Sequence, residues 1–243
     1  MARTEAWLAA NQSDVLCLQE LKLETHKFPH EMFDGLGYRA AVYGQKTYNG
    51  VAIIAKKTLP DFADVQMGVP GFDDEQCRAI AATIGDVRVI DLYVVNGQSI
   101  ESDKFQYKLR WLDAVSTWLA AERAKHEKLV VVGDFNIAPT DADVYDPVAW
   151  AGQVLCTDQE RAAFNHWVGL GLTDCFRKFE HPPKTFTWWD YRMLGFPKNN
   201  GLRIDHILAT PALANTCTAC TVDRNERKGE KPSDHAPVTA TFA

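Results

Sequence analysis

Residues 129–136 read Leu-Val-Val-Val-Gly-Asp-Phe-Asn, an apolar run that ends in polar side chains. A short run rich in β-branched residues predicts a strand packed on at least one face. Ligand and catalytic groups often follow the carboxyl ends of such strands. Asp134 and Asn136 are therefore candidate functional residues, although a strand that simply emerges into solvent explains this segment alone equally well.

Six further apolar runs predict strands by the same pattern. They cover residues 15–19, 51–55, 79–84, 87–95, 203–209 and 237–242. Short turns such as the one at residues 84–87 indicate antiparallel hairpins, which a wholly parallel doubly wound sheet does not accommodate. The strands alternate with helices, so we predict an α/β fold of two mixed β-sheets stacked on each other with helices outside.

The strongest predicted helix covers residues 103–125, with Ser102 as its N-cap. Apolar residues recur along it at steps of three and four: Phe105, Leu109, Leu112, Val115 and Leu119. The opposite face carries Lys104, Lys108 and Glu122, which we expect in solvent. Shorter helices are predicted over residues 4–10 and 158–168.

The bulk composition is that of a globular protein. The 243 residues are 46% hydrophobic, which favours a single domain over residues 1–243. There is neither an apolar run long enough to span a bilayer nor a signal-peptide pattern at the start, so we expect a cytoplasmic protein without a membrane partner. The six cysteines indicate reduced core thiols, and for Cys217 and Cys220 strand packing is favoured over a zinc site.

Two further carboxylates lie next to or within predicted apolar strands. Glu20 follows the predicted strand at residues 15–19, and Asp205 lies inside an otherwise apolar strand. A buried unpaired charge would cost several kcal/mol, so Asp205 needs a partner. A structural ion pair with Arg203 or another basic residue would supply one, and so would a functional pairing.

A polar turn places Asp234 and His235 just before the last strand. A plain surface turn is the simpler alternative. Carboxylate oxygens are suited to Mg²⁺, which binds one or two carboxylates together with substrate phosphate. A carboxylate that activates water and an Asp–His pair that faces a phosphoryl oxygen complete the groups needed for phosphodiester hydrolysis. The net charge of −6 does not indicate a nucleic-acid partner, but carboxylates gathered around a metal contribute to it.

Five segments resemble, in order, the successive motifs of the exonuclease III family of abasic-site endonucleases, within the endonuclease/exonuclease/phosphatase superfamily. They are LCLQELK at 16–22, VVVGDFNIAPTD at 130–141, FTWWDYR at 186–192, GLRIDHIL at 201–208 and EKPSDHAPV at 230–238. The resemblance covers nearly the whole chain, and FTWWDYR is typical of the DNA-repair branch. It implies a four-layered α/β sandwich of two mixed β-sheets flanked by helices.

The resemblance also implies a metal site. Glu20 resembles the main Mg²⁺ ligand of the family, and Asp234 resembles a further metal-site carboxylate. Asp134 and Asn136 are assigned to the same site. We therefore expect Mg²⁺ as the cofactor, for which Mn²⁺ can substitute.

The catalytic assignments follow in the same way. Asp134 resembles the residue that activates water, and Asn136 one that helps to bind the phosphate. Asp205 and His235 resemble a hydrogen-bonded pair whose histidine contacts the scissile phosphate. Tyr93, in the segment LYVVNG, corresponds to a phosphate-contacting tyrosine, although the family more often has proline where this chain has Val95.

Substrate contacts are predicted from two groups of residues. Lys22, Asn96 and Arg110 are expected to bind DNA, with Lys104, Lys108, Arg177, Lys184, Arg192 and Lys198 as further candidates for a phosphate-binding rim. Phe186, Trp188 and Leu202 match positions that form an apolar pocket for a flipped-out abasic sugar. A plain core role for Trp188 and Trp189 is the alternative.

The start of the chain departs from the family pattern. Family members usually begin with a strand that carries a WNVNSLR-like motif, whose asparagine lies at the metal and phosphate site. Residues 1–7 instead resemble the middle of the first helix. We therefore expect a chain that lacks this first strand, with lower activity and stability than a relative that has it.

The predicted function is Mg²⁺-dependent hydrolysis of DNA phosphodiesters in base excision repair, as an abasic-site endonuclease and 3′-5′ exodeoxyribonuclease III. The expected partner is double-stranded DNA with abasic sites or 3′ ends, bound by a monomer. Two alternatives stay open. One is a catalytically weakened DNA-binding remnant, and the other is a related phosphodiesterase that acts on inositol phosphates, sphingomyelin or RNA ends.

Overall fold

The structure is a computed structural model that describes residues 2–243. The chain divides into two compact units, Met1–Tyr93 (unit 1) and Val94–Ala243 (unit 2). Each unit contains both helices and strands, and the strand pairs within each unit are antiparallel, as the predicted hairpins require.

Unit 1 contains two three-stranded ladders, in the orders β1-β3-β2 and β4-β5-β6. The strands are β1 (Val15–Leu18), β2 (Tyr38–Tyr43), β3 (Val51–Lys56), β4 (Phe62–Met67), β5 (Ala79–Ile84) and β6 (Val87–Tyr93). The helical segments are α1 (Ala2–Asn11), η1 (Thr25–Lys27) and α2 (His30–Gly35). Leu8, Phe33, Val42 and Ile54 belong to one buried cluster, which joins both helices to the first ladder.

Unit 2 contains the ladders β7-β9-β8 and β10-β11. Its strands are β7 (Lys128–Asp134), β8 (Thr173–Asp174), β9 (Asp205–Ala209), β10 (Cys217–Val222) and β11 (Val238–Phe242). Its α-helices are α3 (Asp103–Lys125), α4 (Pro147–Trp150), α5 (Asp158–Gly169), α6 (Gly195–Lys198) and α7 (Pro211–Ala214). Single 3₁₀ turns are η2 (Asp141–Asp143), η3 (Phe176–Lys178), η4 (Arg192–Leu194) and η5 (Arg224–Arg227).

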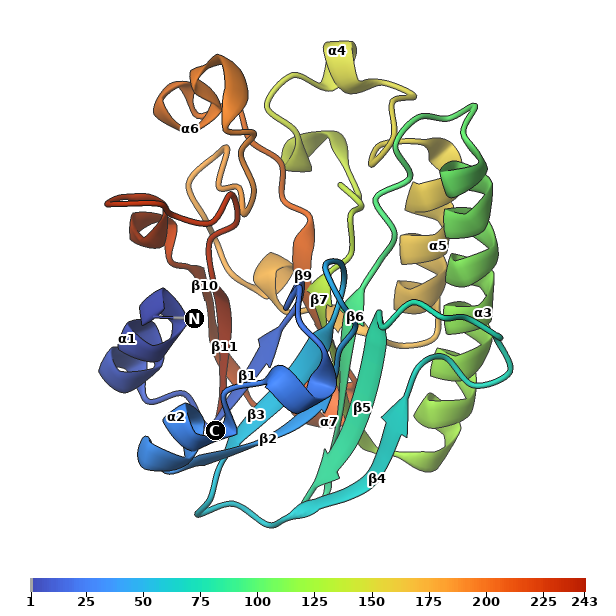
Figure 1. Ribbon diagram of the computed structural model, residues 1–243. Coiled ribbons are helices and arrows are strands. Elements are labelled where there is room, and N and C mark those ends of the chain that lie inside the picture. The colour runs from blue at the N-terminus through green and yellow to red at the C-terminus, as the bar shows by residue number, and fades with distance from the viewer. Residues whose placement is uncertain (1) are drawn as a thin grey trace. The chain divides into compact units, whose positions relative to one another are not determined.

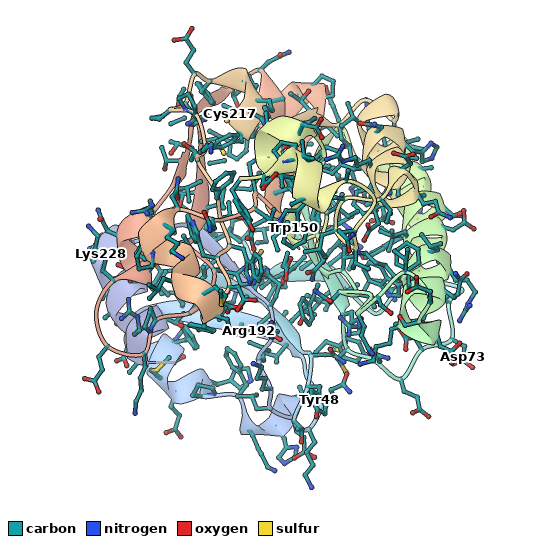
Figure 2. The ribbon with its side chains drawn as sticks, turned by 90° about the horizontal axis from the view of Figure 1, so that it is seen from above. Tyr48, Asp73, Trp150, Arg192, Cys217 and Lys228 are labelled. Carbon is teal, nitrogen blue, oxygen red and sulfur yellow. The ribbon has the colours of Figure 1, made fainter. Side chains whose placement is uncertain are left out.

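Figure 1 shows α3 and α5 lying side by side in unit 2, and β7 beside β9. It also shows α4 and α6 at the same end of this unit. In Figure 2, seen from above, the label Trp150 marks α4, and the label Arg192 marks η4, which directly precedes α6 in the chain. The surface segments at this end carry exposed apolar side chains, including Val148 and Met193.

The predicted helix over residues 103–125 is confirmed, as is its cap, because the Ser102 hydroxyl accepts a 3.1 Å bond from the Phe105 amide. Two residues expected on its solvent face are buried instead. Lys108 is fully buried and Glu122 is 5% exposed. The prediction for Lys108 was wrong because α5 covers that side of α3 and supplies an acidic partner, Glu160.

The predicted strands all form, with ends that differ by one or two residues at most. At residues 203–209 the strand begins at Asp205, because the Arg203 amide bonds to the Asp143 carbonyl instead of a neighbouring strand. Strands β2, β4, β8 and β10 were not predicted. The six cysteines, all within the described residues, are free, and five of them are buried.

Among residues 2–243, no helix has the length and apolar character needed to cross a membrane. The longest, α3, carries charged residues along its whole length.

Candidate active site

The loop after β7 shapes the first part of the site. Asp134 ends the strand, and two residues later Asn136 adopts a positive φ of 48°. The Asn136 amide donates to Asp134 Oδ1 at 2.9 Å, and its side-chain Nδ2 donates to Asp134 Oδ2 at 3.0 Å and to the Val94 carbonyl at 2.9 Å. Both carboxylate oxygens of Asp134 are therefore held by one neighbour.

Asp205 lies opposite Asp134, because the two residues are register partners in the β7–β9 pair. Their side chains consequently leave the sheet on the same face. The buried hydroxyl of Thr187 accepts from the amides of Ile204 and Asp205 at 3.0 and 3.1 Å, which fixes the start of β9. Two carboxylates are thus placed side by side by backbone register.

His235 completes this cluster from the turn before β11. Its Nδ1 lies 2.9 and 3.0 Å from the two oxygens of Asp205, and its Nε2 lies 3.8 Å from Asp134 Oδ2. The turn is held by backbone bonds from Ala236 to Thr187 and from Trp189 to Asp234. Asp205 therefore meets His235, whereas the ion pair of Asp205 with Arg203 that the sequence left open does not form.

The surroundings raise the pKa values of both Asp134 and His235, by different causes. Burial raises the pKa of Asp134 to about 7, an effect that His235 opposes and Asp205 strengthens. Burial lowers the pKa of His235, but the carboxylates of Asp205 and Asp134 outweigh this and raise it to about 10. At neutral pH His235 is therefore an imidazolium, and Asp134 is poised between its acid and base forms.

Asp134, Asp205 and His235 also form the group of potential metal ligands found among the described residues, with one ligand atom from each within 4.8 Å of the others. Their carboxylate oxygens suit a hard divalent cation. His235 fits less well as a ligand, since its raised pKa of about 10 keeps both ring nitrogens protonated at neutral pH. Asp234, which the sequence assigned to the metal, accepts a 3.0 Å bond from Trp188 Nε1.

Unit 1 carries its own polar cluster. Glu20 has a φ of +54°, and its carboxylate accepts a 2.8 Å bond from the Tyr93 hydroxyl and lies 3.2 Å from Lys22 Nζ. Arg78 lies over the Tyr93 ring at 4.8 Å and donates to the Tyr93 carbonyl. Glu20, Lys22 and Tyr93 were predicted from the sequence, but Arg78, which lies in no motif, was not.

Asn96 is exposed, and its side chain donates to Asn136 Oδ1 at 3.1 Å, so these two predicted residues meet. Arg110 is exposed on α3. Of the three residues predicted for an apolar pocket, Phe186 and Leu202 are fully buried, in separate core clusters, and Trp188 is partly exposed. Their pocket role stays a prediction. Trp189 is a core residue.

A buried charge network lies on the face of β9 that carries His206, and it was not predicted from the sequence. Arg203 donates to Asp143 at 2.6 Å and to Asp174 at 2.8 Å, and its Nη1 lies 3.1 Å from His206 Nδ1. His206 Nε2 bonds to the carbonyl of Ile137, in the loop after Asn136. Asp143 and Asp174 stand in segments without a strand or helix signal, so the sequence offered no way to find them.

The sequence model of the Endonuclease/Exonuclease/phosphatase family matches residues 1–235. The Exodeoxyribonuclease III of Haemophilus influenzae is 36% identical, and the match covers 98% of this chain and 93% of that protein. The chain belongs to the exonuclease III family.

Solved structures of this family agree with the fold. A 3′ phosphatase NExo from Neisseria, bound to a product DNA hairpin, is 46% identical with a TM-score of 0.96, and the match covers 100% of this chain and 93% of that chain. An AP endonuclease from Archaeoglobus fulgidus is 37% identical with a TM-score of 0.92, over 98% and 92% of the two chains. The predicted fold class, a mixed α/β fold with two main sheets flanked by helices, is confirmed.

Membership of the exonuclease III family identifies the chain as a DNA nuclease that hydrolyses phosphodiesters. The matches extend over nearly the whole chain and give no sign of a missing strand. They do not support the expectation that a first strand is lacking.

Proposed function

We propose that this exonuclease III family protein is a Mg²⁺-dependent enzyme of base excision repair that cuts DNA at abasic sites and removes nucleotides or blocking groups from 3′ ends. The observation that carries the proposal is the cluster of Asp134, Asp205 and His235. A general base, an orienting carboxylate and an imidazolium are the groups that phosphodiester hydrolysis requires. Relatives whose names describe 3′ and abasic-site activities support the choice of DNA as the substrate.

Each residue of the cluster has a proposed task. Asp134, with a pKa near 7, orients the attacking water and accepts its proton. Asp205 accepts the Nδ1 proton of His235, which directs the Nε2 proton toward a phosphoryl oxygen. The imidazolium then stabilises the negative charge that develops on the phosphate. Asn136 holds Asp134, and Tyr93 is proposed to contact the phosphate.

We propose Mg²⁺ as the cofactor, held by Glu20, Asp234, Asp134 and Asn136, with Mn²⁺ as a substitute. All four side chains offer oxygen ligands, the type that Mg²⁺ prefers. When bound, the cation supplies Lewis-acid stabilisation of the phosphate and of the leaving oxygen. Lys22, Asn96 and Arg110 are proposed to contact the DNA backbone.

The test is cleavage of a duplex that carries one tetrahydrofuran abasic analogue. With Mg²⁺ we expect nicking, which EDTA should abolish. Asp134→Asn should lower kcat by about 10³-fold while DNA binding persists, because the general base is lost but the shape is kept. The matched control is Asp113→Asn, on the exposed side of α3, which should cleave normally. Intact binding without cleavage by the unaltered protein would instead favour the DNA-binding remnant.

The balance between the activities is measured on three substrates. The abasic duplex, a duplex with a recessed 3′ hydroxyl end, and the same duplex with a 3′ phosphate are compared at equal enzyme concentration. All three reactions should fall together in Asp134→Asn, since one cluster is proposed to serve them. Retention of one activity in that variant would show that a different group carries it.

A further inference from the structure

Lys108, in the second turn of α3, is a fully buried lysine whose ammonium group has no access to solvent. Its Nζ donates to the carbonyl of Asn136 at 2.7 Å, to the carbonyl of Asn96 at 3.1 Å, and to Glu160 Oε1. An ammonium has three N–H donors, and here each meets one acceptor. The side chain is therefore committed to these three contacts and cannot serve a phosphate-binding rim.

Glu160, the partner of this lysine, is itself fully buried and held on both oxygens. Oε1 also accepts from the Leu155 amide at 3.0 Å, and Oε2 accepts from the amide and hydroxyl of Thr157 at 3.0 and 2.7 Å. Glu160 closes the capping box at the start of α5. The position of Lys108 is thus fixed by the N-terminus of α5 as well as by the two loops whose carbonyls it binds.

The two carbonyls that Lys108 holds belong to residues of the site. Asn96 and Asn136 bond to each other through their side-chain amides, and Asn136 bonds to both oxygens of Asp134. Asn136 has a positive φ, a conformation that costs energy in a residue other than glycine and needs support from its surroundings. Lys108 supplies that support directly on the strained peptide.

The packing of α3 against α5 does not depend on this lysine alone. Trp167 Nε1 donates to the Ser116 hydroxyl at 2.8 Å, a link between the same two helices that touches none of the site residues. Of these two side-chain links between α3 and α5 in the described residues, the Lys108–Glu160 link reaches the site and the Ser116–Trp167 link does not. This difference allows a structural role to be separated from a role in the reaction.

We propose that Lys108 is a positioning residue that holds the amide side chains of Asn96 and Asn136 in place through their main-chain carbonyls, and so aligns Asp134 for cleavage. The statement about cleavage rests on the proposed nuclease function, whereas the statement about the two amides does not. Two measurements therefore test it separately.

The kinetic test uses a variant that removes both buried charges, Lys108→Met with Glu160→Gln, so that neither is left unpaired. On the abasic duplex its single-turnover rate should fall by about 10²-fold with KM changed by less than about 3-fold, as for a misplaced catalytic group. Ser116→Ala, the control that breaks the other link between the helices, should keep the rate.

The decisive comparison repeats the change in a background of Asn96→Ala with Asn136→Ala. If Lys108 acts through these amides, its loss should cost less than about 3-fold there, because the contacts that it positions are already gone. An equal loss in both backgrounds, or no loss in either, would overturn the proposal. If the double-charge variant does not fold, Lys108→Arg replaces it, since a planar guanidinium cannot place three N–H groups on these acceptors.

The structural test follows the side-chain amide NMR signals of Asn96 and Asn136. Hydrogen exchange at Asn136 Nδ2 should accelerate at least about 10-fold when Lys108 is replaced, and stay unchanged in Ser116→Ala. Unchanged exchange in the Lys108 variant would refute the positioning role, whatever the enzyme does. Absence of cleavage by the unaltered protein would refute the nuclease function, while the exchange data would still decide the role of Lys108.

Discussion

His235 and His206 have contrasting surroundings in unit 2. His206 is a residue of β9, and His235 bonds to Asp205 of the same strand. Asp205 and His206 are successive residues of that strand, so their side chains leave the sheet on opposite faces. Asp205 turns toward His235, whose pKa rises to about 10 because two carboxylates outweigh its burial. His206 turns toward Arg203, and burial with that positive charge lowers its pKa to about 4.

The difference shows that the neighbours, and not the residue type, decide what each histidine does. His235 is charged and 26% exposed on its side chain, so it can meet a phosphate. His206 is 2% exposed and neutral, with one ring nitrogen beside Arg203 and the other bonded to the Ile137 carbonyl. On one face of β9, Asp205 therefore belongs to the active-site cluster. On the other face, His206 stabilises the loop that carries Asn136. Three experiments can break or sharpen this division.

The largest effect is expected on the stability side. Arg203→Met should lower the free energy of unfolding by about 3–5 kcal/mol, because it removes a buried guanidinium that pairs with both Asp143 and Asp174, of which Asp143 keeps a second partner in Arg177. Thermal unfolding measures this as a Tm lower by roughly 10 °C. The control, Arg192→Met, removes an exposed pair with Asp190 and should leave Tm unchanged. An unchanged Tm for Arg203→Met would mean that this network does not stabilise the fold.

The residues of the active-site cluster could be predicted from the sequence, whereas those of the buried charge network around Arg203 could not. Asp134, Asp205 and His235 lie at strand ends or in a motif, and the strands that carry them are defined by local apolar patterns. The residues alone left the partner of Asp205 open, whereas the family resemblance implied His235, and the structure places His235 Nδ1 beside Asp205.

Residues outside such patterns were harder to find. Asp143 and Asp174 join Arg203 only through tertiary contacts, and Lys108 looked like a solvent-facing helix residue because nothing in its own segment indicates that α5 covers it. Thr157 and Glu160 form a capping box at the start of α5, but this local pattern does not indicate that Lys108 contacts Glu160. Strands β2 and β4 were missed because their apolar patterns are weak and mixed.

A smaller effect is expected for Asp205→Asn, which keeps the shape of the pair but removes its charge. The pKa of His235 should fall, so the basic limb of the kcat profile should move to lower pH, and kcat itself should drop by about 10²-fold. The measurement is single-turnover cleavage of the abasic duplex between pH 6 and 10. Asp174→Asn makes the same change in the neighbouring strand β8, next to Arg203, and should leave the pH profile in place. A shifted profile in both variants would contradict the division between the faces.

The smallest effect concerns acid stability and His206. Its folded-state pKa of about 4 lies below the ordinary value of 6.5, so below pH 6.5 the unfolded chain binds a proton that the native ring refuses. This group therefore contributes nothing to the pH dependence above pH 6.5 and removes up to about 1.4 kcal/mol of stability per pH unit as the pH falls toward 4. His206→Gln, which offers a donor and an acceptor but does not titrate, should lose stability less steeply over this interval.

Guanidinium unfolding at pH 7.5, 6.5, 5.5 and 4.5 compares the two proteins, and carboxylates common to both cancel in the difference. His235 does not confound the result, because its raised pKa makes its contribution present below pH 6.5 and lost only as the pH rises toward 10. If the two stability curves stayed parallel from pH 6.5 to 4.5, His206 would not be held neutral by Arg203 and burial. The two histidines would then differ in exposure alone, and the division between the faces of β9 would lose its electrostatic basis.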